Sequence, residues 1–252
     1  MRGLSGKHVI VTGGASGIGR ATCLRLAEEG CTVAIFDRDE AGAGCVAAAC
    51  AGGNAAAYGV DITDEAGVEA AVTAFEDAKG PTDGLANVAG WDKGARFLET
   101  DRALWEHIIG VNLIGPLIMH KVVLRRMAER GAGRVVNVAS DAGRVGSSGE
   151  AVYSACKGGV IAFTKTMARE MARQGITLNC LCPGPTETPL FHRFASDMEG
   201  GQKLKDALAR AIPLRRLGQP DDYPGMIAFL LSDDAAYMTG QTISISGGLT
   251  MA

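Results

Sequence analysis

The residues that decide the fold read TGGASGIGR at positions 12–20, directly after the apolar run HVIVT at positions 8–12. Three glycines there have separate roles: Gly13 permits a tight turn, Gly17 lets backbone N–H groups approach a pyrophosphate, and Gly19 lets the next helix pack closely on the strand. The N-terminus of that helix offers free N–H donors and a partial positive charge to an anion. In this strand–turn–helix context the glycines predict a dinucleotide-binding turn, the alternative being a purely structural one.

Short apolar segments alternate with longer helical patterns along most of the chain. Segments that predict strands lie at residues 8–12, 32–36, 56–60, 84–88, 134–138, 176–180 and 242–245. Helical patterns lie between them near residues 17–29, 39–50, 64–79, 101–130, 151–174 and 221–231. Uninterrupted apolar strands that alternate with helices indicate an α/β fold with a doubly wound parallel sheet of about seven strands and helices on both faces.

No linker, charge block or internal repeat divides the 252 residues, so a single domain over residues 1–252 is predicted. The densest polar and irregular stretch lies at about residues 184–217, which is longer than an ordinary connection in a compact domain. Loops of this length usually carry binding functions, and we therefore expect a substrate-covering lid at about 184–217.

Composition excludes several classes of protein. The net charge is −3 and charged residues make up 21% of the chain, so the basic excess of a nucleic-acid binder is missing. The N-terminal apolar run is too short for a membrane span, and seven cysteines without a CxxC pair indicate a reducing compartment. Four scattered histidines offer no metal-ligand spacing. We expect a cytoplasmic protein that acts on a small molecule, with no nucleic acid, membrane or metal as a partner.

Acidic residues at the ends of the second and third predicted strands are candidates for cofactor recognition. Asp37 lies about twenty residues beyond the glycine turn, where a carboxylate accepts hydrogen bonds from an adenosine ribose and repels a 2′-phosphate. This favours NAD over NADP, although the neighbouring Arg38 has the charge to pair with a phosphate. Asp61 follows the third strand and would accept a hydrogen bond from the adenine amino group. For both aspartates the alternative is an N-cap of the next helix.

Tyr153 and Lys157 are four residues apart in a predicted helix and therefore share one face. An ammonium beside a phenol favours the phenolate and lowers a pKa that starts near 10. Ser140 ends the fifth strand and would donate a hydrogen bond to a substrate oxygen. Asn112 interrupts an apolar helical run, where a polar side chain would contact water. A YxxxK pair alone usually marks only an exposed helix face. The prediction of a catalytic site therefore depends on the occurrence of this pair together with Ser140 and Asn112.

These residues, in this order and spacing, resemble the short-chain dehydrogenase/reductase family over essentially the whole chain. The resemblance implies a Rossmann-type oxidoreductase, typically a homotetramer, with a catalytic tetrad. In it Tyr153 would be the general acid/base, Ser140 would position the substrate oxygen, Lys157 would bind the nicotinamide ribose and Asn112 would hold a water in a proton relay. Val88 stands where the family usually has a second asparagine. The implied cofactor-binding residues are Gly13, Ser16, Gly17, Ile18, Gly19, Asp37, Arg38, Asp61, Ile62, Asn87, Ala89, Gly90, Tyr153, Lys157, Pro183, Gly184, Thr186 and Thr188.

Three stretches bear on the substrate. Residues 89–92, 140–153 and 246–251 resemble family members that act on cyclic hydroxyacyl-CoA substrates, so NAD-dependent oxidation of such a secondary alcohol to its ketone is expected. Two other interpretations stay open. One is a 3-oxoacyl-carrier-protein reductase that uses NADPH, against which Asp37 argues. The other is a non-catalytic dinucleotide-sensing protein, against which the complete tetrad argues.

Candidate substrate residues flank the catalytic positions. Trp91 and Val145 would wall an apolar ring site, and Arg144 or Arg193 would meet a carboxylate or a phosphate of CoA. The alternative for the arginines is an ordinary solvated side chain. Glu150 lies just before the catalytic helix and is expected only to favour the positive end of its dipole.

Overall fold

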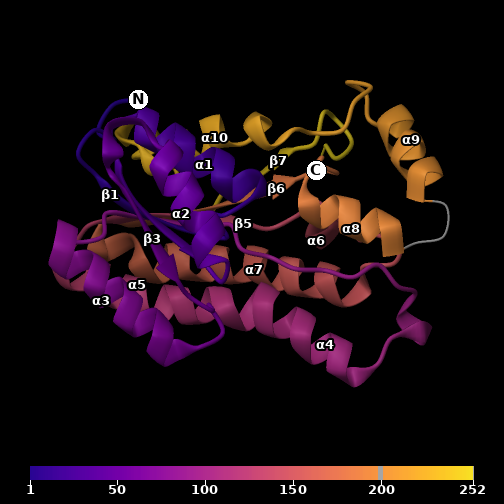
Figure 1. The fold of residues 1–252 in the computed structure, drawn as a ribbon, viewed down its shortest axis with the longest axis horizontal. Coiled ribbons are helices and arrows are strands. Elements are labelled where there is room, and N and C mark those ends of the chain that lie inside the picture. The colour runs from indigo at the N-terminus through magenta and orange to yellow at the C-terminus, as the bar shows by residue number, and fades with distance from the viewer. Residues whose placement is uncertain (198–200, 252) are drawn as a thin grey trace.

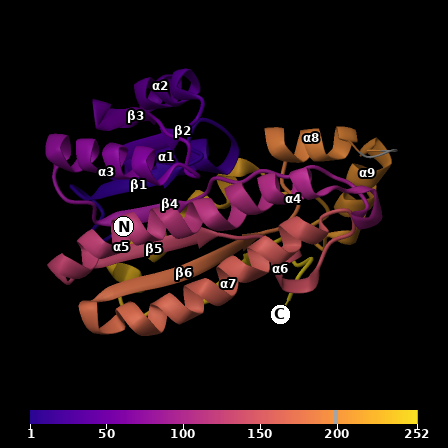
Figure 2. The same cartoon turned by 90° about the horizontal axis from the view of Figure 1, so that it is seen from below.

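The computed structural model describes residues 1–197 and 201–251, and its centre is one parallel sheet (Figures 1 and 2). The strands lie in the order β3-β2-β1-β4-β5-β6-β7. All are parallel, and the order in which successive strands are added to the sheet reverses between β1 and β4. This confirms the predicted doubly wound α/β fold with seven strands. The strands are β1 (His8–Thr12), β2 (Thr32–Asp37), β3 (Ala55–Gly59), β4 (Gly84–Asn87), β5 (Gly133–Val138), β6 (Ile176–Pro183) and β7 (Thr242–Ile245).

Helices cover both faces of this sheet, as Figure 1 shows, with α1, α2 and α10 on one side and α3, α5 and α7 on the other. The helices are α1 (Gly17–Glu28), α2 (Glu40–Ala49), α3 (Glu65–Lys79), α4 (Arg102–Ile109), α5 (Gly115–Arg130), α6 (Ala142–Val145), α7 (Ala151–Met171), α8 (Pro189–Asp197), α9 (Gly201–Ala211) and α10 (Pro224–Leu231). Each face has its own apolar core because strand side chains alternate between the two sides. In β1, for example, Val9 and Val11 belong to the first core and Ile10 belongs to the second.

The helical pattern at residues 101–130 is not one uniform helix. It consists of α4 and α5 joined by a π-helical segment, Gly110–Ile114, and the fully buried Asn112 lies in that segment. Residues Arg102–Arg130 are long and apolar enough to cross a membrane, with a mean hydropathy of 1.5 over 18 residues, but half of that window is buried inside the protein. π-Helical turns are rare in proteins and are frequently found at functional sites.

The stretch at about residues 184–217, expected to be an irregular lid, contains two helices. The amphipathic segments PLFHRFASD and GQKLKDALARA form α8 and α9, and residues 198–200 of the predicted lid lie outside the described residues. Its two ends are joined at a neck, which we define by Thr186 and Gly218. These residues form a β-bridge, the Gly218 N–H donates to Pro185 O at 2.9 Å, and the hydroxyls of Thr186 and Tyr223 are 2.5 Å apart.

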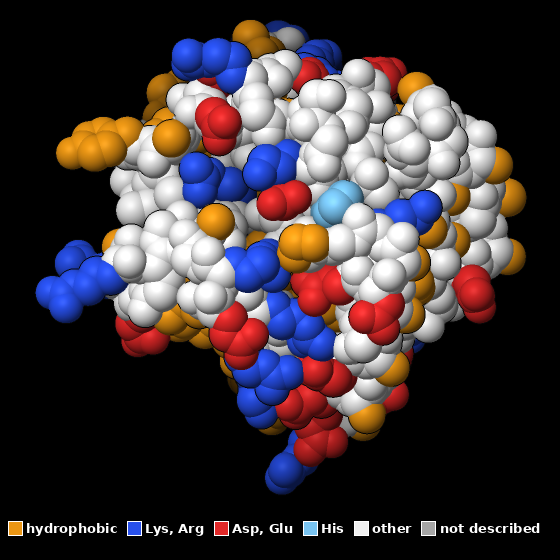
Figure 3. All heavy atoms as spheres, turned by 90° about the vertical axis from the view of Figure 1, so that its left-hand side faces the viewer, with side chains coloured by type: hydrophobic (Ala, Val, Ile, Leu, Met, Phe, Trp, Pro, Cys, Tyr) orange, Lys and Arg blue, Asp and Glu red, His pale blue; other side chains and the backbone are white. Residues whose placement is uncertain are grey.

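The N-terminal ends of the strands form the face shown in Figure 3, where basic and acidic side chains are interspersed. Ion pairs connect several elements near these ends, including Lys7–Asp83 at 3.2 Å and Arg134–Asp233 at 4.0 Å. The strands therefore begin at a charged surface and end at the opposite side, where the cleft described next is found.

Candidate active site

A cleft of about 730 Å³ lies at the carboxyl ends of the strands, beside the point where the strand order reverses. Ligands of open parallel sheets bind at this place. The residues that follow β1, β2, β4, β5 and β6 all contribute to its walls. Of the predicted cofactor residues it is lined by Gly13, Ser16, Gly17, Ile18, Gly19, Asp37, Arg38, Asp61, Ile62, Ala89, Gly90, Tyr153, Lys157, Pro183, Gly184, Thr186 and Thr188.

The glycine turn has the close contacts that require glycine. Gly13 has a φ of +68°, and a Cβ atom there would lie 2.7 Å from the Cα of Ala89. A Cβ at Gly19 would lie 2.0 Å from the carbonyl oxygen of Gly13. Ser16 stands at the N-cap of α1 without a side-chain capping bond. The turn therefore leaves the backbone at the start of α1 open to the cleft, as a bound pyrophosphate requires.

Asp37 ends β2 with its carboxylate fixed at the cleft. The Ala15 N–H donates to one of its oxygens and the Asp39 N–H to the other, both at 3.0 Å. The N-cap of α2 is Asp39, which accepts from Gly42 N–H at 2.9 Å, so the capping interpretation of Asp37 is wrong. Arg38 is exposed and also lines the cleft.

The same distinction applies to Asp61. The N-cap of α3 is Asp64, whereas Asp61 accepts from the N–H and hydroxyl of Thr63 at 2.9 and 2.7 Å. Its carboxylate is thus placed by a local turn at the cleft wall rather than at a helix end. Both aspartates line the cleft, and their recognition of a cofactor stays a prediction.

Asn87 is a predicted cofactor residue that the structure does not bring to the cleft. Its side chain is 5% exposed and donates to Asn137 Oδ1 at 3.1 Å, which ties β4 to β5 inside the protein. The neighbouring backbone is held by Thr12, whose hydroxyl accepts from the N–H groups of Val88 and Ala89 at 3.0 and 3.1 Å. Asn87 therefore positions the turn after β4 from behind.

Three members of the predicted tetrad meet in the cleft. Tyr153 and Lys157 lie one turn apart on α7, and the Lys157 Nζ atom is 5.5 Å from the centre of the Tyr153 ring. Lys157 is 3% exposed and donates to Val138 O at 3.0 Å, which fixes the ammonium against the end of β5. Ser140 lines the cleft together with Tyr153, and its hydroxyl lowers the pKa of that tyrosine. A substrate oxygen between Ser140 and Tyr153 would contact both hydroxyls.

The protein's own groups shift these pKa values in an unexpected direction. Burial raises the pKa of Tyr153, the charges of Glu150 and Asp92 raise it further, and the Ser140 hydrogen bond lowers it. Burial also lowers the pKa of Lys157 to about 8. The lowering of the Tyr153 pKa that the lysine was expected to cause is therefore outweighed, because desolvation disfavours both charged forms.

Asn112, the fourth tetrad residue, lies behind the cleft wall. Its Nδ2 donates to Trp91 O at 2.6 Å and to Ile108 O at 2.9 Å, and its Oδ1 accepts from Trp91 N–H at 3.2 Å. A Cβ on Gly90 would lie 3.1 Å from Asn112 Oδ1 and 3.5 Å from Lys157 Nζ, so the missing side chain leaves space between these two atoms. The π-segment thus clamps the loop after β4; the water relay through Asn112 stays a prediction.

Of the four candidate substrate residues, three line the cleft and one does not. Trp91 and Val145 line the cleft, and the Trp91 ring packs edge-on against His107 with centroids 4.4 Å apart. Arg144 is not among the lining residues, because its Nη1 donates to Ser244 Oγ at 2.7 Å. Arg193 on α8 does line the cleft.

Sequence reasoning missed the apolar wall that α8 supplies and a carboxyl pair near Tyr153. Leu190, Phe191 and Phe194 line the cleft from α8, and Asp92 and Glu150 line it near Tyr153. The amphipathic pattern of residues 189–197 is a signal that would have revealed the first group. No local pattern predicts the second, since its members are far apart in the sequence.

Comparisons with known proteins agree with this geometry. The family described as Enoyl-(Acyl carrier protein) reductase matches residues 13–250. A 3-oxoacyl-[acyl-carrier-protein] reductase of Vibrio harveyi is 37% identical over 98% of this chain and 99% of its own length. An acetoacetyl-CoA reductase of Allochromatium vinosum is 36% identical over 96% of this chain and 98% of its own length.

A solved structure is equally similar. The 3-ketoacyl-(acyl-carrier-protein) reductase from Brucella melitensis, complexed with NADH, has a TM-score of 0.90 and 34% identity, covering 98% of this chain and 100% of that one. Fold, cleft and sequence similarity over nearly the whole length lead to one conclusion: the chain belongs to the short-chain dehydrogenase/reductase family of oxidoreductases.

Proposed function

We propose that this protein is an NAD-dependent dehydrogenase that oxidises a secondary alcohol to a ketone. The observation that carries the proposal is the meeting of Ser140, Tyr153 and Lys157 in the cleft that begins at the glycine turn. The residues of the cleft fit a nicotinamide dinucleotide, since the turn at Gly13 and Gly19 has no space for side chains and the start of α1 faces the cleft.

The side chains divide the chemistry among them. Ser140 donates a hydrogen bond to the substrate oxygen and holds it beside Tyr153, whose phenol, once ionised against the effect of its burial, removes the hydroxyl proton. Lys157, fixed by Val138 O, places a positive charge near that phenol and favours the ionised form. A bound nicotinamide dinucleotide supplies the hydride acceptor and, when oxidised, a further positive charge. The alcohol carbon thus loses a hydride and its oxygen loses a proton, which gives the ketone.

The choice of NAD follows from Asp37. Its carboxylate is held at the cleft by two backbone amides, where it would accept hydrogen bonds from a ribose and repel a 2′-phosphate. The exposed Arg38 is the competing influence. Two backbone donors keep the carboxylate in place, whereas the long arginine side chain is free to turn toward solvent, so we assign NAD.

For the substrate we propose 2-hydroxycyclohexanecarboxyl-CoA or a related cyclic hydroxyacyl thioester. The resemblance at residues 89–92, 140–153 and 246–251 supports this choice. One wall of the cleft is apolar, as a saturated ring requires, and is formed by Trp91, Val145, Leu190, Phe191 and Phe194. The similarity to a relative named as an acetoacetyl-CoA reductase supports a CoA thioester as the substrate.

A second candidate is a 3-oxoacyl-carrier-protein reductase. The 37% identity to the Vibrio harveyi enzyme and the similar Brucella melitensis structure favour it. The two candidates differ in the acyl carrier and in the direction and cofactor of the reaction. A clear preference for NADPH with a 3-oxoacyl substrate would reject the first candidate.

The decisive assay follows NADH absorbance during turnover of cyclic hydroxyacyl-CoA esters, with NAD and NADP compared at equal concentration. Tyr153→Phe removes the proton acceptor, so we expect kcat to fall by about 10²–10⁴-fold while NAD binding, followed by calorimetry, stays unchanged. Undiminished turnover by Tyr153→Phe would contradict the assignment of the acid/base. Glu106→Gln, an exposed change on α4, serves as the control.

A further inference from the structure

Two carboxyl groups lie beside Tyr153 and have no part in the proposed chemistry. Asp92 directly follows Trp91 in the loop after β4, and Glu150 is the last residue before α7. Both line the cleft, and both line a small adjoining pocket of about 10 Å³ together with Tyr153. Residues that are 58 positions apart in the sequence are thus brought next to the reacting phenol.

Asp92 lacks the partners that a buried carboxylate needs. It is 3% exposed, and neither of its carboxyl oxygens accepts a well-formed hydrogen bond from a described residue. The Lys93 N–H and the charge of Lys157 compensate only in part. A carboxylate in this position is strongly unfavourable and takes up a proton instead.

Glu150 is the acidic residue that shares this pocket with Asp92. Both line the same space of about 10 Å³, and two carboxyl groups can hydrogen-bond to each other only when one of them carries a proton. Glu150 stands at the N-cap of α7 but makes no capping bond with its side chain, so the helix does not account for its position. Burial, followed by the charge of Glu150, raises the pKa of Asp92 to about 7.

We propose that Asp92 and Glu150 share one proton and select a neutral acyl group over a free carboxylate beside the reacting alcohol carbon. The inference rests on the proposed function, since it concerns the substrate of the same cleft. With one proton between them, the pair keeps one negative charge at neutral pH. That charge repels the carboxylate of a free hydroxy acid and tolerates the uncharged carbonyl of a thioester.

The other charged groups of the cleft do not cancel this effect. Lys157 on α7 is bound to Val138 O and faces Tyr153, and Asp141 after β5 is bonded by the Ser244 hydroxyl. Arg193 approaches from α8, and Arg38, Asp37 and Asp61 lie at the ends of β2 and β3. Near Tyr153 the carboxyl pair is therefore opposed chiefly by a lysine that the nicotinamide ribose is expected to engage.

The first test compares 2-hydroxycyclohexanecarboxylate with its N-acetylcysteamine thioester, which differ in charge while both lack the CoA nucleotide. We expect the wild-type kcat/KM to favour the thioester. In the double variant Asp92→Asn with Glu150→Gln, we expect the preference to fall by about tenfold or more, because the like charge is gone. Glu106→Gln changes the same charge on the exposed face of α4 and is expected to leave the preference unchanged.

The second test needs no turnover. Calorimetry of the same two compounds on NADH-loaded Tyr153→Phe protein is expected to show tighter binding of the thioester, with the difference removed in the Asp92→Asn, Glu150→Gln background. Infrared difference spectra at neutral pH are expected to show a protonated carboxyl band that is lost in each single variant. Thermal melting and NAD binding show that the variants are folded.

The outcomes separate this inference from the proposed function. If the wild type oxidises neither compound but binds the thioester preferentially, the proposed function fails and the carboxyl pair stands. The inference is overturned if both compounds bind equally or neither binds. It is also overturned if the double variant keeps the wild-type preference or if the infrared spectra show no protonated carboxyl band. These outcomes count whatever substrate the enzyme oxidises.

Discussion

Asp37 is the residue on which the proposed choice of NAD over NADP depends. Its carboxylate is fixed by the Ala15 and Asp39 N–H groups, so it cannot turn away from an incoming 2′-phosphate. We expect Asp37→Ala to lower the ratio of kcat/KM for NAD over NADP by about 10–100-fold, measured by initial rates. Asp39→Ala is the matched control: it removes the cap of α2 and is expected to cost about 1 kcal/mol of stability without changing the ratio. An unchanged ratio in Asp37→Ala would reject the assignment.

Because His120 is buried, we expect the protein to lose stability in acid. It is 1% exposed, its Nε2 atom has no partner among the described residues, and burial lowers its pKa to about 4. Between the unfolded pKa of about 6.5 and the folded value, the unfolded chain binds more protons, so stability falls as the pH falls through this window. The loss is about 3 kcal/mol at most. Urea unfolding of His120→Gln at several pH values is expected to show a shallower dependence between pH 6.5 and 4. An identical dependence would mean that other groups cause the acid loss.

The residue scale also shows what a sequence can and cannot predict. Tyr153 and Lys157 could be placed together because their relation is local to one helix turn. The position of Arg144 outside the cleft could not be predicted, because Ser244, the partner that holds it, lies 100 residues away. The family resemblance marks Asn112 as a tetrad residue that holds a water, but its contacts with Trp91 depend on a π-helical segment that no local pattern distinguishes from an α-helix.

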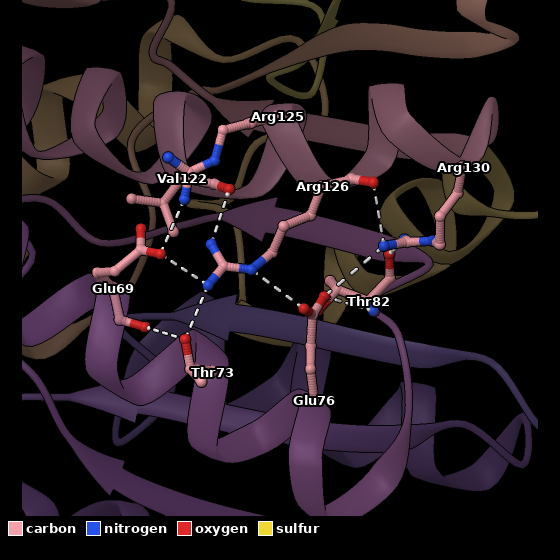
Figure 4. Close-up of polar contacts among 8 residues, drawn as sticks. All are labelled: Glu69, Thr73, Glu76, Thr82, Val122, Arg125, Arg126 and Arg130. Atoms are coloured by element: carbon pink, nitrogen blue, oxygen red, sulfur yellow. Dashed lines mark hydrogen bonds and ion pairs between the residues drawn. The ribbon is translucent and has the colours of Figure 1, made fainter.

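At the element scale, α3 and α5 are joined by a polar network rather than by apolar contacts alone (Figure 4). Arg126 is the centre of this network. Its side chain is 15% exposed and contacts Glu69 at 2.8 Å, Thr73 at 2.8 Å and Glu76 at 3.1 Å. Arg130 adds a contact to Glu76 at 3.8 Å. Several partners share one partly buried guanidinium, and this arrangement contributes more than an isolated surface pair.

We expect Arg126→Met to lower the free energy of unfolding by about 1–3 kcal/mol, because Glu69 and Glu76 lose their shared partner while the apolar stem is kept. Arg102→Met removes a single pair with Glu106, in which both side chains are mostly exposed, and is expected to cost less than about 0.5 kcal/mol. Chemical denaturation of both variants measures the difference. Equal effects would show that the network adds nothing beyond a surface ion pair.

Element prediction succeeded where apolar runs are unbroken and failed where helices are short and charged. The prediction for β1 agrees with the observed His8–Thr12, because the strand is apolar and flanked by glycine and charged residues. On sequence alone, the stretch that contains α8 and α9 is interpreted as irregular because proline and charged residues interrupt it. The folding of this stretch depends on burying Phe194 of α8 and Ile212, which follows α9, against the rest of the protein. Such burial is a tertiary effect.

At the scale of the whole molecule, the sheet ends at β7, which pairs with β6 on one side only. The homotetramer implied by family resemblance would cover part of this edge, and it stays a prediction. We expect a solution mass of four times 26.0 kDa by analytical ultracentrifugation at micromolar concentration. A single species of one chain's mass under these conditions would contradict it.

The neck at Thr186 and Gly218 has a consequence for engineering. Because these residues already pair side by side, the segment between them leaves and re-enters the scaffold at nearly one point. A segment of different length from a relative could therefore be grafted between them without disturbing β6 or α10. Chimaeras made at this junction would transplant the apolar wall of α8 as one unit, and would show how much of substrate choice travels with it.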